Sequence, residues 1–239
     1  MKKKLKELLL RLLAFFKRSD EPIVVFYHDV GRDHTDMGTD FDLFRSHITK
    51  AKKCGYSFVR GFPRRKGDVQ ICFDDGFRGI WDHRDYFFAE HLQPTVFVAR
   101  DLVGRPGYLT TEEIRMLHKK GFDFQSHTLT HHTLPEQGRE NIRKELSGSK
   151  EWLSKLLGDE VGGICFPCGY YSKAVIDEAC KCGYKDLYSS LPGFANDLAD
   201  NHLICRNLVQ GLTDSGFLAV LRGGMVSLRW RYVKQHFKD

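Results

Sequence analysis

The 239-residue sequence has no uninterrupted apolar run near the ~20 residues that a membrane-spanning helix needs, no internal repeat and no low-complexity segment. An integral membrane protein is therefore excluded, and the composition also excludes collagen, coiled-coil and disordered chains. The start also lacks the small-x-small cleavage site of a signal peptide, because Arg11 interrupts the apolar stretch 8–16 and charged residues follow it. We therefore expect the amino-terminal segment to be retained.

A disulfide framework is also lacking, because the seven cysteines are an odd number and several lie in apolar, strand-like surroundings. This usage is typical of a reducing compartment and predicts a cytoplasmic protein. A structural zinc site made of Cys165, Cys168, Cys180 and Cys182 is disfavoured. Only the first pair has zinc-knuckle spacing, and the second pair lies in a predicted helix.

The formal net charge of +6 comes from the two ends of the chain. Residues 1–19 carry seven basic residues against one acidic residue, and residues 222–239 carry five against one, whereas residues 20–221 carry 25 against 29. The mildly acidic body argues against a nucleic-acid-binding protein. The basic ends favour contact with an anionic surface such as a membrane.

Residues 1–20 predict a basic amphipathic helix. One face gathers apolar residues and another gathers charged ones: Leu5, Leu8, Leu9, Leu12, Leu13 and Phe16 against Lys4, Glu7, Arg11 and Arg18. Two interpretations stay open. The helix lies as a peripheral anchor on the inner face of the membrane, or its apolar face covers the bottom of the domain. Residues 222–239 form a basic tail with interleaved aromatic residues, which fits a membrane surface or a solvated, disordered end.

Residues 21–221 alternate short apolar runs with helical patterns and show no change in composition, which indicates one domain. Strands are expected at 23–27, 57–60, 68–73, 95–98, 122–126, 163–166, 186–189 and 203–208, and helices at 41–54, 80–91, 110–120, 138–157, 173–182 and 214–221. Thr110 and Glu113 form a capping box, and Gly121 ends that helix. The pattern predicts an α/β fold, a single-domain distorted (β/α) barrel of about seven parallel strands.

Polar residues follow the predicted strands where the carboxyl ends should meet: His28, Asp74, Asp75, His127 and His131. Adjacent residues leave a strand in different directions, so one carboxylate of the Asp pair can bind a cation while the other faces the reacting group. Capping of a turn is the alternative for that pair. The two histidines are four apart, which places them on one face of a helical turn. Two imidazoles and one carboxylate are typical of an open, catalytic metal site.

Together these residues resemble the polysaccharide deacetylase family with its NodB-type domain, over about residues 23–212. The resemblance rests on four stretches: Phe26 to His28, Cys72 to Gly76, Gly121 to Ser126 leading into His127 and His131, and Phe166 to Tyr170. It implies a distorted (β/α) barrel in which Asp75, His127 and His131 hold a divalent ion, usually zinc, and Asp74 is the general base. It also implies that the turn Pro167, Cys168, Gly169 and Tyr170 contacts substrate. The Cys168 N–H would stabilise the oxyanion there, and Tyr170 would stack on the sugar or serve as a buried structural residue.

Two departures from the family pattern stand out. Cys165 lies near the place of an arginine that orients the catalytic aspartate, so that contact is missing or replaced. The Leu-x-His motif that supplies the acid for the departing amine has no counterpart in residues 218–222. His28, at the end of the first strand, is our candidate for that acid, with a purely structural histidine as the alternative.

The sequence therefore predicts a metal-dependent hydrolase that removes an N-acetyl group from an N-acetylated sugar. The substrate would belong to a surface polysaccharide, a lipid-linked glycan or a glycolipid, and the bond broken is a linear C–N amide bond. A catalytically weakened carbohydrate-binding protein on the same fold is the alternative, because of the two departures. Hydrolysis of a different ester or amide at the same metal is a third hypothesis.

Overall fold

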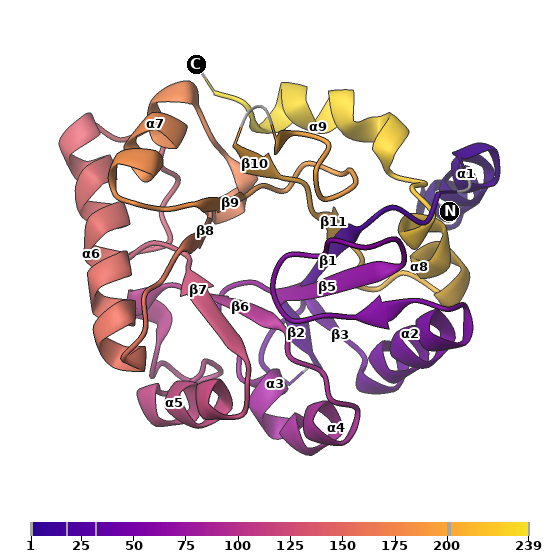
Figure 1. Cartoon of the computed structure of the whole chain (residues 1–239), viewed down its shortest axis with the longest axis horizontal. Helices are drawn as coiled ribbons and strands as arrows, with labels where there is room; N and C mark the ends of the chain where they lie inside the picture. Colours follow the sequence, from indigo (N-terminus) through magenta and orange to yellow (C-terminus); the bar gives the residue numbers. More distant parts are fainter. Residues whose placement is uncertain (1, 18, 32, 200–201, 239) are drawn as a thin grey trace.

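The computed structural model describes residues 2–17, 19–31, 33–199 and 202–238, without the side chains of residues 2–4. The predicted places of the Lys4 side chain and of Arg18 on the amphipathic helix therefore lie outside the parts of the chain that the structure describes. The core is one curled sheet of nine strands, all paired in parallel, with helices around it (Figure 1). Its order is β10-β9-β8-β7-β6-β5-β1-β11, with β4 paired to β5. The predicted (β/α) barrel is confirmed.

The strands agree closely with the expected apolar runs. Their bounds are β1 (Ile23–Tyr27), β4 (Ser57–Phe58), β5 (Asp68–Phe73), β6 (Thr95–Val98), β7 (Asp123–Ser126), β8 (Gly163–Cys165), β9 (Asp186–Tyr188), β10 (Leu203–Ile204) and β11 (Asn207–Leu208). A separate two-stranded pair, β2 (Asp29–Val30) and β3 (Gly38–Thr39), follows the carboxyl end of β1.

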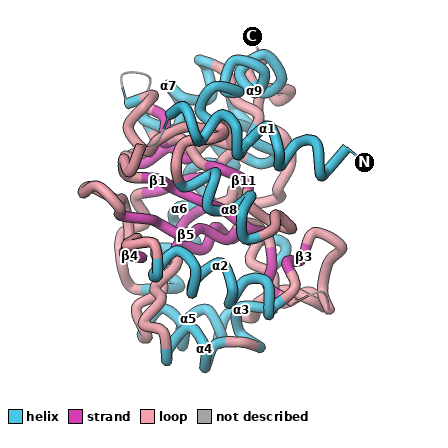
Figure 2. The backbone as a smooth tube through the Cα atoms, turned by 90° about the vertical axis from the view of Figure 1, so that its right-hand side faces the viewer, coloured by secondary structure: helices cyan, strands magenta, loops and turns pink. Residues whose placement is uncertain are grey.

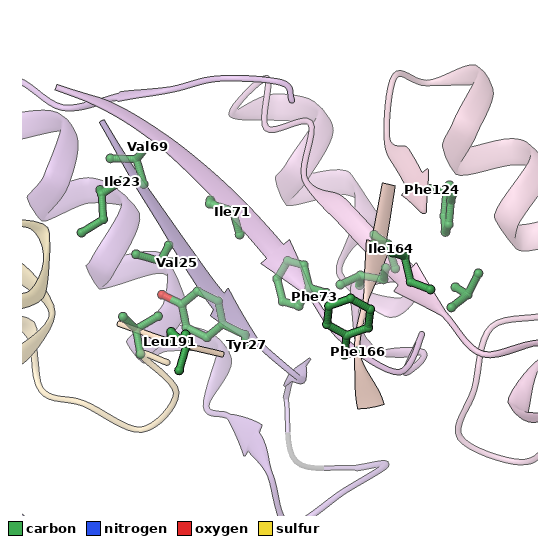
Figure 3. Packing of buried hydrophobic residues seen from close by; sticks show 14 of the residues in the cluster. Ile23, Val25, Tyr27, Val69, Ile71, Phe73, Phe124, Ile164, Phe166 and Leu191 are labelled. Atoms are coloured by element: carbon green, nitrogen blue, oxygen red, sulfur yellow. The ribbon is translucent and has the colours of Figure 1, made fainter. Parts of the chain in front are cut away.

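Alternate residues along the strands serve two different cores. Ile23, Val25 and Tyr27 of β1 lie in register with Val69, Ile71 and Phe73 of β5 and face the helices (Figure 3). The residues between them face the inside of the barrel, where a second buried cluster forms: Val24, Phe26, Cys72, Phe97, Cys165, Tyr188, Ala195 and Ile204. Both faces of the central strands are covered, which explains their continuous apolar runs.

The sheet closes through a single extended segment, residues 203–208. Its first half, β10, pairs with β9 and its second half, β11, pairs with β1. Only Cys205 and Arg206 separate the two halves. The predicted strand at 203–208 is therefore split where the chain crosses from one sheet edge to the other, and the main barrel consists of seven passes of the chain.

Helices cover the outside of the sheet (Figures 1 and 2): α2 (Phe41–Lys53), α3 (Gly79–Asp82), α4 (Arg84–Ala89), α5 (Thr111–Lys119), α6 (Arg139–Leu157), α7 (Lys173–Lys181) and α8 (Asp214–Leu221). The capping box of Thr110 and Glu113 is present at α5. The single helix expected at 80–91 is broken into α3 and α4. His83 leaves the helical conformation there (φ −105°, ψ 17°) and stacks on Phe41 with ring centres 3.7 Å apart.

The two basic ends of the chain are also helical. The first helix, α1 (Lys2–Lys17), packs against α8, and residues 226–236 form η4 (Val226–Leu228) and α9 (Arg229–His236). The helix does pack on the domain, but not through the predicted apolar face: among its described side chains the buried ones are Glu7, Leu10 and Ala14. The residues predicted for the apolar face are exposed, apart from the half-buried Leu13. Within the described ranges, no helix combines the length and apolar character that crossing a membrane requires.

Candidate metal and catalytic site

The five predicted catalytic and metal-binding residues meet in one pocket of about 280 Å³ at the carboxyl ends of the barrel strands. Asp74 and Asp75 follow β5, His127 follows β7, and His28 follows β1. All four residues and His131 line the pocket. The other lining residues are Phe26, Met37, Phe166, Cys168, Gly169, Ser190, Leu208, Tyr232 and His236.

Asp75, His127 and His131 present three donor atoms toward one point. The Oδ1 of Asp75 lies 3.0 Å from Nε2 of His131 and 3.3 Å from Nε2 of His127, and the two Nε2 atoms are 3.1 Å apart. The Nδ1–H of His127 donates to the carbonyl oxygen of Cys165 at 2.7 Å, so the lone pair of Nε2 faces the other donors. Three converging acceptors fit a divalent cation, and histidine with carboxylate suits zinc among such ions.

A second group, Asp74, His127 and Cys165, also brings three ligand-type atoms together. It fits a cation poorly, because Arg206 donates to both Asp74 and the Cys165 sulfur. Burial also raises the pKa of the Cys165 thiol, which keeps it protonated and a weak ligand. Among the groups found in the described part of the chain, none joins Cys165 and Cys168 with Cys180 and Cys182.

His131 reaches the site through a loop and not through the predicted helical turn. Residues 127–131 are irregular, with Thr128 at φ 71° and His131 at φ 63°. Buried Glu145 of α6 holds this loop: its carboxylate accepts the N–H of Leu129 at 2.9 Å and the N–H of Thr130 at 3.0 Å. A helix glutamate that serves a distant loop carries no local sequence signal.

Left-handed backbone is concentrated at the site. Asp75 has φ 70° and Cys168 φ 56°, so with Thr128 and His131 four non-glycine residues around the pocket adopt this sparsely populated region. Gly76, at φ 75°, completes the turn after Asp75, and a Cβ atom there would lie 2.9 Å from Cγ1 of Val98. Such strain persists where the surrounding structure fixes the side chains in place.

Asp74 is buried and paired with Arg206. The guanidinium makes two hydrogen bonds to the carboxylate, at 2.6 Å (Nη1 to Oδ1) and 2.9 Å (Nη2 to Oδ2). Arg206 is itself fully buried and lies over the rings of Phe26 and Phe97. Burial works to raise the pKa of Asp74, but the charge and hydrogen bonds of Arg206 outweigh it, so the pKa falls below its ordinary value. Asp74 is therefore ionised at neutral pH.

Arg206 supplies the contact to Asp74 that the first departure from the family pattern, the missing arginine near Cys165, had left open. No arginine lies near Cys165 in the sequence, but Arg206 enters from the β10–β11 crossing and its Nη2 lies 2.8 Å from the Cys165 sulfur. The guanidinium thus reaches Asp74 from another strand of the barrel. A charged residue in the middle of the apolar strand 203–208 is the sequence signal that could have identified it.

The second departure, the missing Leu-x-His motif, belongs to another part of the chain than residues 218–222. Residues 218–222 belong largely to α8, which packs on α1 and α2 away from the pocket. At the barrel mouth, Leu208 is followed two residues later by Gln210, so glutamine stands at the histidine position of a Leu-x-His spacing. The Nδ1–H of His28 donates to Oε1 of Gln210 at 2.6 Å. This bond directs the other ring nitrogen of His28 away from Gln210.

The predicted substrate turn contributes in part. Cys168 and Gly169 line the pocket, whereas Pro167 and Tyr170 do not, and Phe166 takes a place that the sequence did not suggest. The half-buried Tyr170 ring contacts the ring of His236, with centres 5.7 Å apart. Six more lining residues were not predicted as site residues: Phe26, Met37, Ser190, Leu208, Tyr232 and His236. The last two come from α9, in the segment predicted as a tail, because a helix that returns to the mouth is not encoded by any local pattern.

Comparison with known proteins agrees with this geometry. The family model for polysaccharide deacetylase matches residues 62–187. YxkH of Bacillus subtilis (strain 168), whose name places it among the polysaccharide deacetylases, is 24% identical over 155 residues, which are 64% of this chain. The match spans 56% of the length of that relative.

Solved structures share the fold. The Streptococcus pyogenes deacetylase PplD, in complex with acetate, superimposes with a TM-score of 0.73 at 21% identity, over 85% of this chain and 99% of that one. IcaB from Ammonifex degensii gives a TM-score of 0.75 at 19% identity, over 86% and 98%. The family model covers more than half of the sequence, and the barrel agrees with it, so the chain belongs to the polysaccharide deacetylase family.

Proposed function

We propose that this protein is a metal-dependent carbohydrate N-deacetylase, which hydrolyses the C–N bond of an acetamido group on a sugar. The observation that carries the proposal is the division of labour between two adjacent carboxylates. Asp75 joins two imidazoles in a three-donor set, whereas Asp74 is held by Arg206 beside it. One acid is thus available for a cation and the other for a proton.

A divalent cation held by Asp75, His127 and His131, zinc being our choice, would polarise the acetyl oxygen and make a water molecule more acidic. Asp74 accepts the proton of the attacking water, and Arg206 fixes the direction of its carboxylate. The water oxygen forms the new bond to the acetyl carbon, the C–N bond breaks, and acetate and a free amine leave. The Cys168 N–H is our candidate donor to the oxyanion.

His28 is our candidate for the acid that protonates the departing amine. It lines the same pocket as Asp74, and Gln210 fixes the ring through Nδ1. The second nitrogen, Nε2, is then the atom that would carry the transferred proton. His236 also lines the pocket, with its Nδ1–H donating to the carbonyl oxygen of Tyr232, and it is the matched histidine for a test of this role.

The substrate class is an N-acetylated glycan, in a surface polysaccharide, a lipid-linked glycan or a glycolipid. The pocket has apolar walls of Phe26, Phe166 and Leu208, which suit an acetyl methyl group, beside the polar donors. The alternative of a weakened binding protein loses one of its two arguments, because Arg206 supplies the orienting contact that seemed absent.

The test is release of free amine from an N-acetylated oligosaccharide after loading with zinc. We expect turnover by the wild type, loss of about 10²–10⁴-fold in Asp74→Asn, and loss of turnover on treatment with a chelator that added zinc restores. Asp85→Asn, at the first turn of α4, is the matched control for a changed carboxylate outside the pocket. Sugar binding without turnover by the zinc-loaded wild type would establish the binding protein instead.

A further inference from the structure

The exposed large apolar side chains of this protein are concentrated on α1. Among the described residues, ten large apolar side chains are exposed, and six of them belong to this one helix: Leu5, Leu8, Leu9, Leu12, Phe15 and Phe16. We call these six residues the outer face of α1. Phe16 is 82% exposed and Leu5 68%, values that no core-facing residue has. A contiguous apolar surface of this kind marks an interaction site.

The outer face is not a misplaced core face, because the helix already has a core face. Leu10 is fully buried and Ala14 nearly so, where α1 packs on α8. Glu7 fixes the rotation of the helix: its carboxylate accepts the hydroxyl of Thr213 at 2.5 Å, just before α8 begins. Rotation that buried the outer face would expose Leu10 and break this contact.

Because Glu7 is buried, the exposed charge of α1 is entirely positive among its described side chains. Glu7 is the only acidic residue in 1–17, and it is turned inward. The exposed charged residues among the described side chains of α1 are Lys6, Arg11 and Lys17, all basic. The apolar outer face is therefore bordered by positive charge alone, which complements an anionic partner.

A groove of about 450 Å³ runs between α1 and α8. Apolar residues such as Leu8, Leu12 and Leu218 line it, together with the guanidinium-bearing Arg11 and Arg222. Aliphatic walls beside two cations suit a lipid, whose acyl chain is apolar and whose phosphate is anionic. Trp230 at the start of α9, 68% exposed, adds a side chain of the type enriched at membrane interfaces.

From these observations we infer that α1, with its groove against α8, is a docking surface for the surface of an anionic lipid bilayer. The helix would lie in the interface with the outer face among the acyl chains and the basic residues at the phosphates. A second copy of the chain is a worse partner, because antiparallel pairing of two such helices brings only positive charges together at their borders.

The amino-terminal end of α1 extends toward the end of the barrel that carries the catalytic pocket (Figure 2). In Figure 2 the amino-terminal end of α1 extends on the same side of the molecule as the β2–β3 pair. This pair follows the carboxyl end of β1, and Met37, between β2 and β3, lines the catalytic pocket.

The test uses the full chain in sedimentation with vesicles of phosphatidylcholine alone or mixed with phosphatidylglycerol. We expect the wild type to sediment with the mixed vesicles at low salt and to be released at high salt. Leu9→Asp and Phe16→Asp should each weaken this binding about ten-fold or more, as should Lys6→Glu with Arg11→Glu. Met116→Asp, on the exposed side of α5, is the matched control and should bind like the wild type.

Equal binding of Leu9→Asp and the wild type to the mixed vesicles would overturn the inference, and so would absence of wild-type binding. Dimers that dissociate in Leu9→Asp, without vesicle binding, would identify the surface as a contact between copies. Turnover of a short soluble acetylated sugar is measured on the same variants. It should stay at the wild-type value, so loss of membrane binding is distinguishable from failure of the proposed hydrolase. Thermal unfolding confirms that each variant is folded.

Discussion

At the scale of single residues, the molecule is most unusual where Arg206 meets Asp74, because two opposite charges are buried inside the barrel. The Arg206 guanidinium lies over the rings of Phe26 and Phe97, and both side chains of the pair are buried. A buried ion pair adds little net stability, but loss of one partner leaves an unpaired charge in a medium of low polarity. The arrangement therefore serves to hold Asp74 in one place and in one charge state.

The first prediction concerns this pair. Arg206→Met should lower the free energy of unfolding by about 3–5 kcal/mol, because Asp74 keeps its burial and loses its counter-charge. Adding Asp74→Asn should recover part of that loss, since the second change removes the unpaired charge. Urea unfolding of the two single variants and the double variant provides the measurement. Additive losses in the double variant would mean that the two side chains act independently.

A second residue-scale prediction separates the proton donor from its neighbours. His28→Asn should lower kcat on an acetylated sugar by about 10²–10⁴-fold, because the amine would leave unprotonated. With an activated phenyl acetate the loss should be small, since a phenolate leaves without a proton. His236→Asn is the comparison: an equal or greater sugar-specific loss in this variant would assign the acid to His236 instead.

At the scale of elements, a buried histidine with a lowered pKa, His47, links α2 to the chain just before α8. The Nε2–H of His47 donates to the carbonyl oxygen of Leu212 at 3.0 Å, and the Tyr27 hydroxyl donates to its Nδ1 at 2.9 Å. Its ring stacks on Phe217 with centres 4.3 Å apart. Burial lowers the pKa of His47 from 6.5 to about 4, so this link between elements requires the neutral ring.

Because of His47, the free energy of unfolding should decrease as pH falls. The unfolded chain takes up a proton below about pH 6.5, whereas folded His47 does not until about pH 4, so the contribution is complete above pH 6.5 and is lost as pH falls toward 4. Between about pH 7 and pH 4.5 the free energy of unfolding should drop by about 2–3 kcal/mol more in the wild type than in His47→Gln. Burial raises the pKa of Asp29 to about 7, which acts in the opposite sense but equally in both proteins.

The rotation of α1 makes a further prediction at this scale. Leu10→Ala should lower the free energy of unfolding by about 2–5 kcal/mol, because Leu10 is fully buried against the body of the protein. Leu9→Ala, the same change one position earlier, should lie within about 0.5 kcal/mol of the wild type, because Leu9 is 42% exposed. Urea unfolding compares the two, and equal losses would contradict the orientation of the helix.

At the scale of the whole molecule, the barrel is closed by residues 203–208, which join β9 to β1 and which we call the seam. Asn207 of β11 ties this seam together: its Nδ2 donates to the carbonyl oxygens of Val24 and Gly193, at 3.1 and 2.8 Å, and its Oδ1 accepts the Gly193 N–H at 3.2 Å. Residues at 24, 193 and 207 are thus joined by one side chain. Closure depends on contacts between opposite ends of the domain sequence.

Asn207→Ala should accordingly weaken the barrel as a unit. The buried groups that it leaves unpaired should cost about 1–3 kcal/mol each, reduced where water can enter. Hydrogen exchange should accelerate together in β1 and β9, the two strands that the seam connects. Acceleration confined to residues near 207 would show that the seam is not required for cohesion of the sheet.

Much of the fold follows from local patterns. The runs at 23–27 and 68–73, the capping box of Thr110 and the paired carboxylates are visible in the sequence, because burial and capping impose fixed spacings on neighbouring residues. The same local reasoning failed for the loop of His131, where positive φ angles and Glu145 replace a helical turn. It also assigned the place of the missing Leu-x-His motif to residues 218–222 instead of near Gln210, since strand ends are aligned only once the sheet is paired.

The sequence by itself determined the alternation of strands and helices and the kinds of donor at the strand ends, because both are encoded within a few residues. Tertiary structure alone decided that Arg206 reaches Asp74, that Gln210 holds His28, and that α1 turns Glu7 inward and its leucines outward. These pairings join residues between 130 and 210 positions apart along the chain. Closure of the barrel brings them together, and no local spacing records that closure.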